Sequence, residues 1–200
     1  DLAVAEWNMD GRVDILVQGL TGVLAIFLAD AAGGFSERLD FRVSNQASTW
    51  GLEVADMDGD LLPDVLVGGL DVTMYRGLPG GGLDIQQPRA VMDGSVAPGV
   101  AQVIRRVDAN GDVYPDVVAM KRFQTVTTLL VSLGAPGVPM SRSGEVSLPA
   151  CTYASGMEVL DVGNDGVQDV VVLCSGGLQV VLGDGVGGFA PGVLMPLPSA

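Results

Sequence analysis

The sequence predicts an all-β fold made of four repeated units of about 50 residues each. Two observations predict it: a nine-residue acidic segment recurs at near-constant spacing, and short apolar runs of strand length flank every copy. No stretch shows the 3.6-residue periodicity of an amphipathic helix. The four acidic segments are Glu6–Asp14, Asp56–Asp64, Asp108–Asp116 and Asp161–Asp169, and their first residues lie 50, 52 and 53 positions apart.

Each unit is expected to contain four strands. The first precedes the acidic segment, and a valine-rich second strand follows it directly. The lack of polar alternation in the second strand indicates burial on both faces. A third strand, a glycine-rich turn and a more polar fourth strand complete the unit. The expected strands are 2–5, 14–17, 22–28 and 38–43 in the first unit, 52–55, 64–67 and 71–75 in the second, 103–107, 116–119, 125–133 and 145–148 in the third, and 157–160, 169–173 and 178–182 in the fourth.

Four antiparallel strands per unit, joined by tight turns, are typical of the blades of a β-propeller. Because both faces of a blade pack on neighbouring blades, this architecture accounts for the 48% hydrophobic residues. We expect one propeller region over residues 1–200, with blades at approximately 1–48, 49–99, 100–153 and 154–200. The four blades either close into a small ring or form part of a larger one. The larger ring is favoured because the chain begins directly in a strand and ends after a fourth-strand stretch at Pro198.

The charge composition excludes some classes of function. The formal net charge is -14, and the chain has nine arginines and one lysine without a basic patch, which argues against nucleic-acid binding. No apolar run approaches the roughly 18 residues that a membrane-spanning helix needs. The acidic segments hold 13 of the 24 Asp and Glu residues. Divalent cations bound there would bring the net charge to an ordinary value.

The acidic segments have the composition of a site for a hard cation. In Asp56–Asp64, carboxylates stand at positions 1, 3, 5 and 9, and the carbonyl of the seventh residue is available. Alternating oxygen ligands of this kind suit Ca2+ and resemble the start of an EF-hand loop, although strands rather than helices flank them here. Without a cation, the carboxylates would repel one another. The alternative is that the Asp-Gly and Asn-Gly pairs form hairpin turns without a metal.

We predict up to four Ca2+ sites, one per unit. The segment Asp56–Asp64 ranks first because it has four carboxylates, and Asp161–Asp169 ranks last because Gly163 stands at position 3. The candidate ligands are Asp56, Asp58, Asp60, Leu62 (carbonyl) and Asp64; Asp108, Asn110, Asp112, Tyr114 (carbonyl) and Asp116; Glu6, Asn8, Asp10, Arg12 (carbonyl) and Asp14; and Asp161, Asp165, Val167 (carbonyl) and Asp169.

The two cysteines allow two interpretations. Cys174 directly follows residues 169–173 and ends that predicted strand, and Cys151 lies just before the preceding strand, so a hairpin would place both sulfurs at the same end. A disulfide would suit an oxidising compartment. The other interpretation is a pair of small buried thiols.

The sequence also resembles a known family. The motifs DMDGDLLPDVLVGG, DANGDVYPDVVAM and GDGVGGF closely resemble FG-GAP repeats, which are also described as VCBS-type or integrin-α-like propeller repeats, over essentially the whole chain. The resemblance implies a β-propeller with Ca2+ between the first two strands of some blades. It also implies an extracellular, secreted or cell-surface location and roles in adhesion and ligand binding. Propellers of this family usually have about seven blades, whereas this chain supplies four units.

Three functions follow from these features. The favoured one is a non-enzymatic, Ca2+-binding module whose protein or carbohydrate partner contacts the loops between blades at 45–50, 93–99 and 149–156. Trp50 and Tyr153 are the aromatic contact candidates there. The alternative is a structural scaffold or a fragment of a larger assembly, completed by other subunits or further blades. A lyase or hydrolase domain is less favoured because the chain has no histidine and no nucleophile–base pair.

Overall fold

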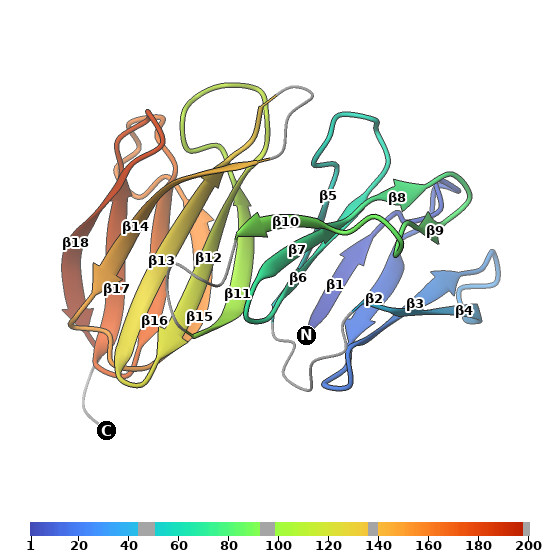
Figure 1. Ribbon diagram of the computed structural model, residues 1–200, viewed down its shortest axis with the longest axis horizontal. Coiled ribbons are helices and arrows are strands. Elements are labelled where there is room, and N and C mark those ends of the chain that lie inside the picture. The colour runs from blue at the N-terminus through green and yellow to red at the C-terminus, as the bar shows by residue number, and fades with distance from the viewer. Residues whose placement is uncertain (44–50, 93–98, 136–139, 198–200) are drawn as a thin grey trace.

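The computed structural model describes residues 1–43, 51–92, 99–135 and 140–197, and strands joined by turns account for this part of the chain. Four antiparallel sheets contain four strands each, and Figure 1 shows them side by side along the molecule. Sheet 1 contains β1 (Leu2–Ala5), β2 (Asp14–Gln18), β3 (Val23–Ala29) and β4 (Phe35–Arg42); sheet 2 contains β5 (Leu52–Ala55), β6 (Asp64–Gly68), β7 (Val72–Tyr75) and β10 (Arg89–Met92); sheet 3 contains β11 (Val100–Val107), β12 (Asp116–Phe123), β13 (Val126–Leu133) and β14 (Ser141–Leu148); sheet 4 contains β15 (Ala154–Leu160), β16 (Asp169–Cys174), β17 (Gly177–Gly183) and β18 (Phe189–Pro196).

Each sheet is an up-and-down meander in which strands adjacent in sequence are also adjacent in space. The all-β prediction and the four strands per unit are confirmed. Sheet 2 differs in one respect, because a short hairpin of β8 (Gly77–Leu78) and β9 (Gly82–Leu83) separates β7 from β10. The turn of that hairpin contains Gly80 and Gly81, whose φ angles of 77° and 82° are accessible to glycine without strain.

The hydrophobic core consists of three layers, each between two consecutive sheets. Burial of the second strand on both faces, as predicted, is found in β6, where every residue is buried, and in the first six residues of β12. In β2 buried residues alternate with partly buried ones, and Leu173 of β16 is exposed. The outer strands β4 and β18 are the most exposed, which also agrees with the sequence. The layers between sheets therefore carry the stability of the fold, since apolar burial contributes about 25 cal/mol per Å2.

The sheets form an open arc. Strand contacts join sheet 1 to sheet 2, sheet 2 to sheet 3 and sheet 3 to sheet 4, and Figure 1 shows the first and fourth sheets at opposite ends of the molecule. Apolar side chains are exposed on both terminal sheets: Leu2 and Val4 on β1 of sheet 1 and Val193 and Met195 on β18 of sheet 4 are 44% to 70% exposed. No helix in the described residues is long and apolar enough to cross a membrane.

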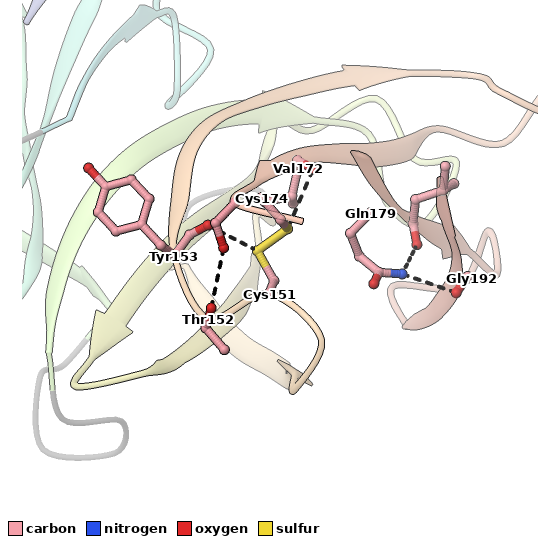
Figure 2. Close-up of a disulfide and its surroundings, with 9 residues drawn as sticks. Cys151, Thr152, Tyr153, Val172, Cys174, Gln179 and Gly192 are labelled. Atoms are coloured by element: carbon pink, nitrogen blue, oxygen red, sulfur yellow. Dashed lines mark hydrogen bonds between the residues drawn. A yellow bond between two sulfur atoms is a disulfide. The ribbon is translucent and has the colours of Figure 1, made fainter. Parts of the chain in front are cut away.

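Cys151 and Cys174 form a disulfide, so the interpretation as two free thiols is wrong. The bond joins the segment before β15 to the end of β16, with a Cα–Cα distance of 5.1 Å (Figure 2). The β15–β16 register brings the two residues together, because Ala154 pairs with Cys174. The disulfide therefore closes the end of sheet 4 that lies opposite its acidic segment.

Candidate metal-binding loops and the adjoining cavity

The four acidic segments are the turns between the first and second strand of every sheet, as the sequence predicts. They run from β1 to β2, from β5 to β6, from β11 to β12 and from β15 to β16. The side chains at positions 5 and 9 make the same hydrogen bonds in each sheet, so the repeat in sequence is also a repeat in local structure. We number the loops 1 to 4 in chain order.

The aspartate at position 9 of each loop is buried and connects two parts of its sheet. In loop 3, Asp116 accepts hydrogen bonds from the backbone N–H of Ala109 and of Gly134, both at 2.8 Å. These donors belong to the loop and to the residue after β13. In the other loops the corresponding donors are the backbone N–H groups of Trp7 and Ala29 for Asp14, of Met57 and Gly77 for Asp64, and of Val162 and Gly183 for Asp169. The position therefore has a structural role that the sequence analysis, which assigned it only to a metal, did not find.

The carboxylates at positions 1 and 5 fold each loop back on itself. Asp56 accepts from the N–H groups of Gly59 and Leu61, at 2.7 and 2.9 Å, and Asp60 accepts from that of Leu62 at 2.9 Å. In all four loops the carboxylate at position 5 accepts a hydrogen bond from the backbone N–H of position 7. In the other three loops, Asp10 accepts from Arg12, Asp112 from Tyr114 and Asp165 from Val167. At position 1 of the same three loops, Glu6, Asp108 and Asp161 accept hydrogen bonds from N–H groups further along their own loop.

Position 3 differs between loops. In loops 1 and 3 it is an asparagine: the amide of Asn8 donates to Asp10 at 2.9 Å, and that of Asn110 donates to Asp112 at 2.8 Å. In loop 4 it is Gly163, which has no side-chain oxygen. Loop 2 alone has a carboxylate there, Asp58, so the four loops offer different sets of oxygen ligands.

Loop 2 gathers three of its predicted ligands. One oxygen each of Asp56, Asp58 and Asp64 lies within 4.8 Å of the others. Burial raises the pKa of Asp64 to about 6, and the charges of Asp58 and Asp60 add to the rise against the opposing N–H bonds of Met57 and Gly77. Hard oxygen atoms at this spacing fit a divalent cation of the Ca2+ type, which would offset the repulsion between the carboxylates.

An arginine that the sequence analysis did not single out lies on loop 2. Arg76, directly after β7, donates to Asp58 at 2.5 Å and to Asp60 at 2.9 Å. Arg12 forms an ion pair with Asp10 within loop 1. A cation entering either loop would compete with the guanidinium group for these oxygens. Arg76 and Asp60 are 16 residues apart in the sequence, so only the strand register indicates that they meet.

Loop 2 also contains a strained residue. Leu61 at position 6 has a φ of 69° and is 77% exposed, so its side chain contributes little burial. A left-handed conformation costs a non-glycine residue about 1–2 kcal/mol. Loops 1 and 4 place glycine at position 6, Gly11 and Gly166, with φ of 84° and 87°.

Replacing Leu61 with glycine is expected to raise the free energy of unfolding by about 0.5–1 kcal/mol, because relief of the strain exceeds the added entropy of the unfolded chain. Urea denaturation measures the change. Val113 is the matched control, since it holds position 6 of loop 3, is 92% exposed and is not among the residues with positive φ. Val113→Gly should lower the stability, and an equal effect of both substitutions would contradict the assignment of strain to Leu61.

A cavity of about 770 Å3 lies between sheets 2 and 3 and borders two acidic loops. Asp56 and Asp58 from loop 2 and Asp108 and Tyr114 from loop 3 line it, together with Arg76. This volume falls in the range of about 300–1,000 Å3 that is common for small-molecule sites. The cavity could not be predicted from the sequence, because its walls come from separate repeats.

One of the three predicted partner-binding segments is described in full. In the segment 149–156, Tyr153 is 50% exposed, and the Arg122 guanidinium lies 4.8 Å from the centre of its ring. Figure 2 shows Tyr153 beside the disulfide. The segment 45–50, with Trp50, and residues 93–98 of the segment 93–99 lie outside the described residues. Tyr153 is therefore the aromatic contact candidate that the structure places on the surface.

Comparison with known proteins agrees with this architecture. Residues 7–67 match the family model described as FG-GAP-like repeat, which confirms the resemblance found in the sequence. No curated protein matches the chain.

Solved structures with a similar fold include a lectin from Agrocybe aegerita, described as recognising non-reducing terminal N-acetylglucosamine (TM-score 0.61, 17% identity, 98% of this chain and 52% of that chain covered). A second is the exotype rhamnogalacturonan lyase YesX (TM-score 0.54, 15% identity, 95% of this chain and 40% of that chain covered). A third is a rhamnogalacturonan lyase from Bacillus licheniformis (TM-score 0.51, 15% identity, 94% of this chain and 41% of that chain covered). The chain spans about half the length of these proteins or less. At such identities the likeness is one of fold, and it supports a β-propeller module.

Proposed function

We propose that this FG-GAP-type repeat protein is a non-enzymatic, Ca2+-binding propeller module that holds a protein or carbohydrate ligand outside the cytoplasm. The observation that carries the Ca2+ part is the grouping of Asp56, Asp58 and Asp64 in loop 2, with one oxygen of each within 4.8 Å of the others. When bound, Ca2+ would supply positive charge and oxygen coordination at a turn rich in carboxylates. Because Asp64 also accepts a hydrogen bond from the N–H of Gly77, the first residue of β8, a cation on loop 2 would stiffen the connection between sheet 2 and the β8–β9 hairpin.

Three observations support the other parts of the proposal. The disulfide between Cys151 and Cys174 favours an oxidising compartment such as the cell exterior. The fold likeness to a lectin favours a carbohydrate ligand, although two lyases share the same fold and keep an enzyme as the competing function. The loop carboxylates are held by backbone N–H groups, and the chain has no histidine, which favours binding over general acid–base catalysis.

The scaffold function has an observation of its own in its favour. Val4 on sheet 1 and Val193 on sheet 4, the two terminal sheets, are 61% and 70% exposed, and exposed apolar side chains on terminal sheets favour contact with further blades or other subunits. We therefore propose that such elements complete a larger propeller. The two functions are compatible, since a binding module can also be one part of a larger ring.

Adding Ca2+ to chelator-treated protein is expected to raise the melting temperature by about 5 to 10 °C at a Ca2+ concentration near 100 times the dissociation constant. Differential scanning calorimetry measures the rise. Asp60→Ala should reduce the rise more than Asp165→Ala, because loop 4 lacks the ligand at position 3. Each aspartate accepts a 2.9 Å bond from the N–H of position 7, and Asp60 also pairs with Arg76, so the rise of each variant is measured against its own melting curve in chelator. The same melting curve with Ca2+ and with chelator would contradict the proposal.

A further inference from the structure

Three of the nine arginines, Arg76, Arg89 and Arg106, line the cavity between sheets 2 and 3. This gathering is unexpected in a chain with a net charge of -14. The strand register shows what these positions hold in the other repeats. It also shows that the sequence at this interface departs from the repeat.

Arg76 occupies a position that is leucine in the other repeats. Tyr75 pairs with Val65, as Phe27 pairs with Ile15 in sheet 1, so Arg76 corresponds to Leu28. The same register makes Leu133 the counterpart in sheet 3. Leu28 and Leu133 pack in the core layers between sheets 1 and 2 and between sheets 3 and 4.

Arg106 follows the same pattern, and Arg89 differs in the same way from its counterpart in sheet 1. Arg106 pairs with Val117, as Val54 pairs with Val65 and Val159 with Val170, so its counterparts are valines packed against the flanking core layers. Arg89 pairs with Met74, as Leu39 pairs with Ile26, and Leu39 packs against the layer between sheets 1 and 2. Three apolar positions that close the interface between sheets 1 and 2 are therefore arginines between sheets 2 and 3.

The substitutions leave two of the guanidinium groups available to a ligand. Arg76 is occupied by Asp58 and Asp60. Arg106 acts on Glu53 through its charge, and neither Arg106 nor Arg89 forms an ion pair with another described side chain within 4 Å. Both side chains are exposed. Arg89 and Arg106 therefore present two positive charges to one cavity from neighbouring sheets, where an anion would interact with both.

We propose that this cavity binds a sugar acid, with Arg89 and Arg106 on its carboxylate. Guanidinium groups bind carboxylates through paired, charge-assisted hydrogen bonds. Asp56, Asp108 and Gln168 also line the cavity and offer oxygen acceptors, which suit the hydroxyl groups of a sugar better than a simple anion. Tyr114 is 37% exposed and adds an apolar ring surface. This inference deepens the binding role proposed above by naming a site and a ligand class, and it does not rest on Ca2+.

The test compares a uronic-acid disaccharide with the neutral disaccharide that carries CH2OH in place of the carboxylate, by calorimetric titration of the whole chain at one fixed Ca2+ concentration. The acid should bind at least tenfold more tightly than its neutral counterpart. Arg106→Val, which restores the residue of the other repeats, should weaken binding of the acid at least tenfold, as should Arg89→Leu. The melting temperature of both variants should not fall, because the introduced valine and leucine are the residues that Val54 and Leu39 supply at the equivalent positions of other sheets.

Arg38 provides the control, since it lies on β4 in sheet 1, away from the cavity, and its side chain is 54% exposed. Arg38→Leu should bind the acid as the unmodified chain does. The proposal would be overturned if the acidic and neutral sugars bound equally well, or if inorganic sulfate bound as tightly as the acidic sugar. An unchanged affinity for the acid in both cavity variants would also overturn it. The Ca2+ proposal fails or holds separately, because it is judged by the melting temperature with and without chelator.

Discussion

Replacing Asp116 with alanine is expected to lower the free energy of unfolding by about 3 to 5 kcal/mol, because two buried N–H donors lose a charged acceptor and each such loss costs about 1–3 kcal/mol. Those donors are the backbone N–H groups of Ala109 and Gly134, both 2.8 Å from the carboxylate. The substitution therefore separates loop 3 from the end of β13. Chemical denaturation in the presence of a chelator measures the effect without any contribution from a bound metal.

Asp108→Ala in the same loop is the control for that experiment. Asp108 is exposed and accepts one hydrogen bond, from the N–H of Gly111. Its loss should cost about 1 kcal/mol or less, since water can replace the acceptor. If the two substitutions destabilise the chain equally, position 9 does not have the structural role assigned to it.

Removing the disulfide is expected to lower the free energy of unfolding by about 3 kcal/mol, because the unfolded chain regains the entropy of a closed loop. The two cysteines are 23 residues apart. Urea denaturation of the double variant Cys151→Ala, Cys174→Ala measures the loss, and alanine leaves no polar group at these buried positions.

The unmodified chain under reducing conditions is the matched comparison. Its unfolding midpoint should fall toward that of the double variant, and a reductant should leave the double variant unchanged. An unfolding midpoint that is the same with and without the disulfide would contradict a stabilising role for the bond.

The sequence predicts much of the fold because each acidic segment marks a turn between two strands. Placing that turn at Asp56–Asp64 also places β5 before it and β6 after it, and the unbroken apolar run of β6 indicates burial on both faces. The extra hairpin of β8 and β9 was not predicted, because a run of glycines fits a simple turn equally well. The disulfide could not be decided from the sequence, since it depends on the register that pairs Ala154 with Cys174.

The site was predicted less completely than the fold. The nine-residue pattern identifies loop 2 as a group of carboxylates, and the structure brings Asp56, Asp58 and Asp64 together. The pattern does not reveal that Arg76 pairs with Asp58, because the two residues lie on different elements. Nor does it reveal the cavity, whose arginines stand out only when strand register aligns them with Leu28, Leu39 and Val54. Contacts between strands depend on the pairing register, and the local sequence determines that register only in part.

Equilibrium dialysis of the chain against Ca2+ decides whether the acidic loops bind this cation. We expect bound Ca2+ at a stoichiometry of up to one ion per loop, and one ion fewer in Asp56→Ala, whose side chain belongs to the carboxylate group of loop 2. A protein that binds no Ca2+, or an Asp56→Ala variant that binds as many ions as the unmodified chain, would contradict this expectation.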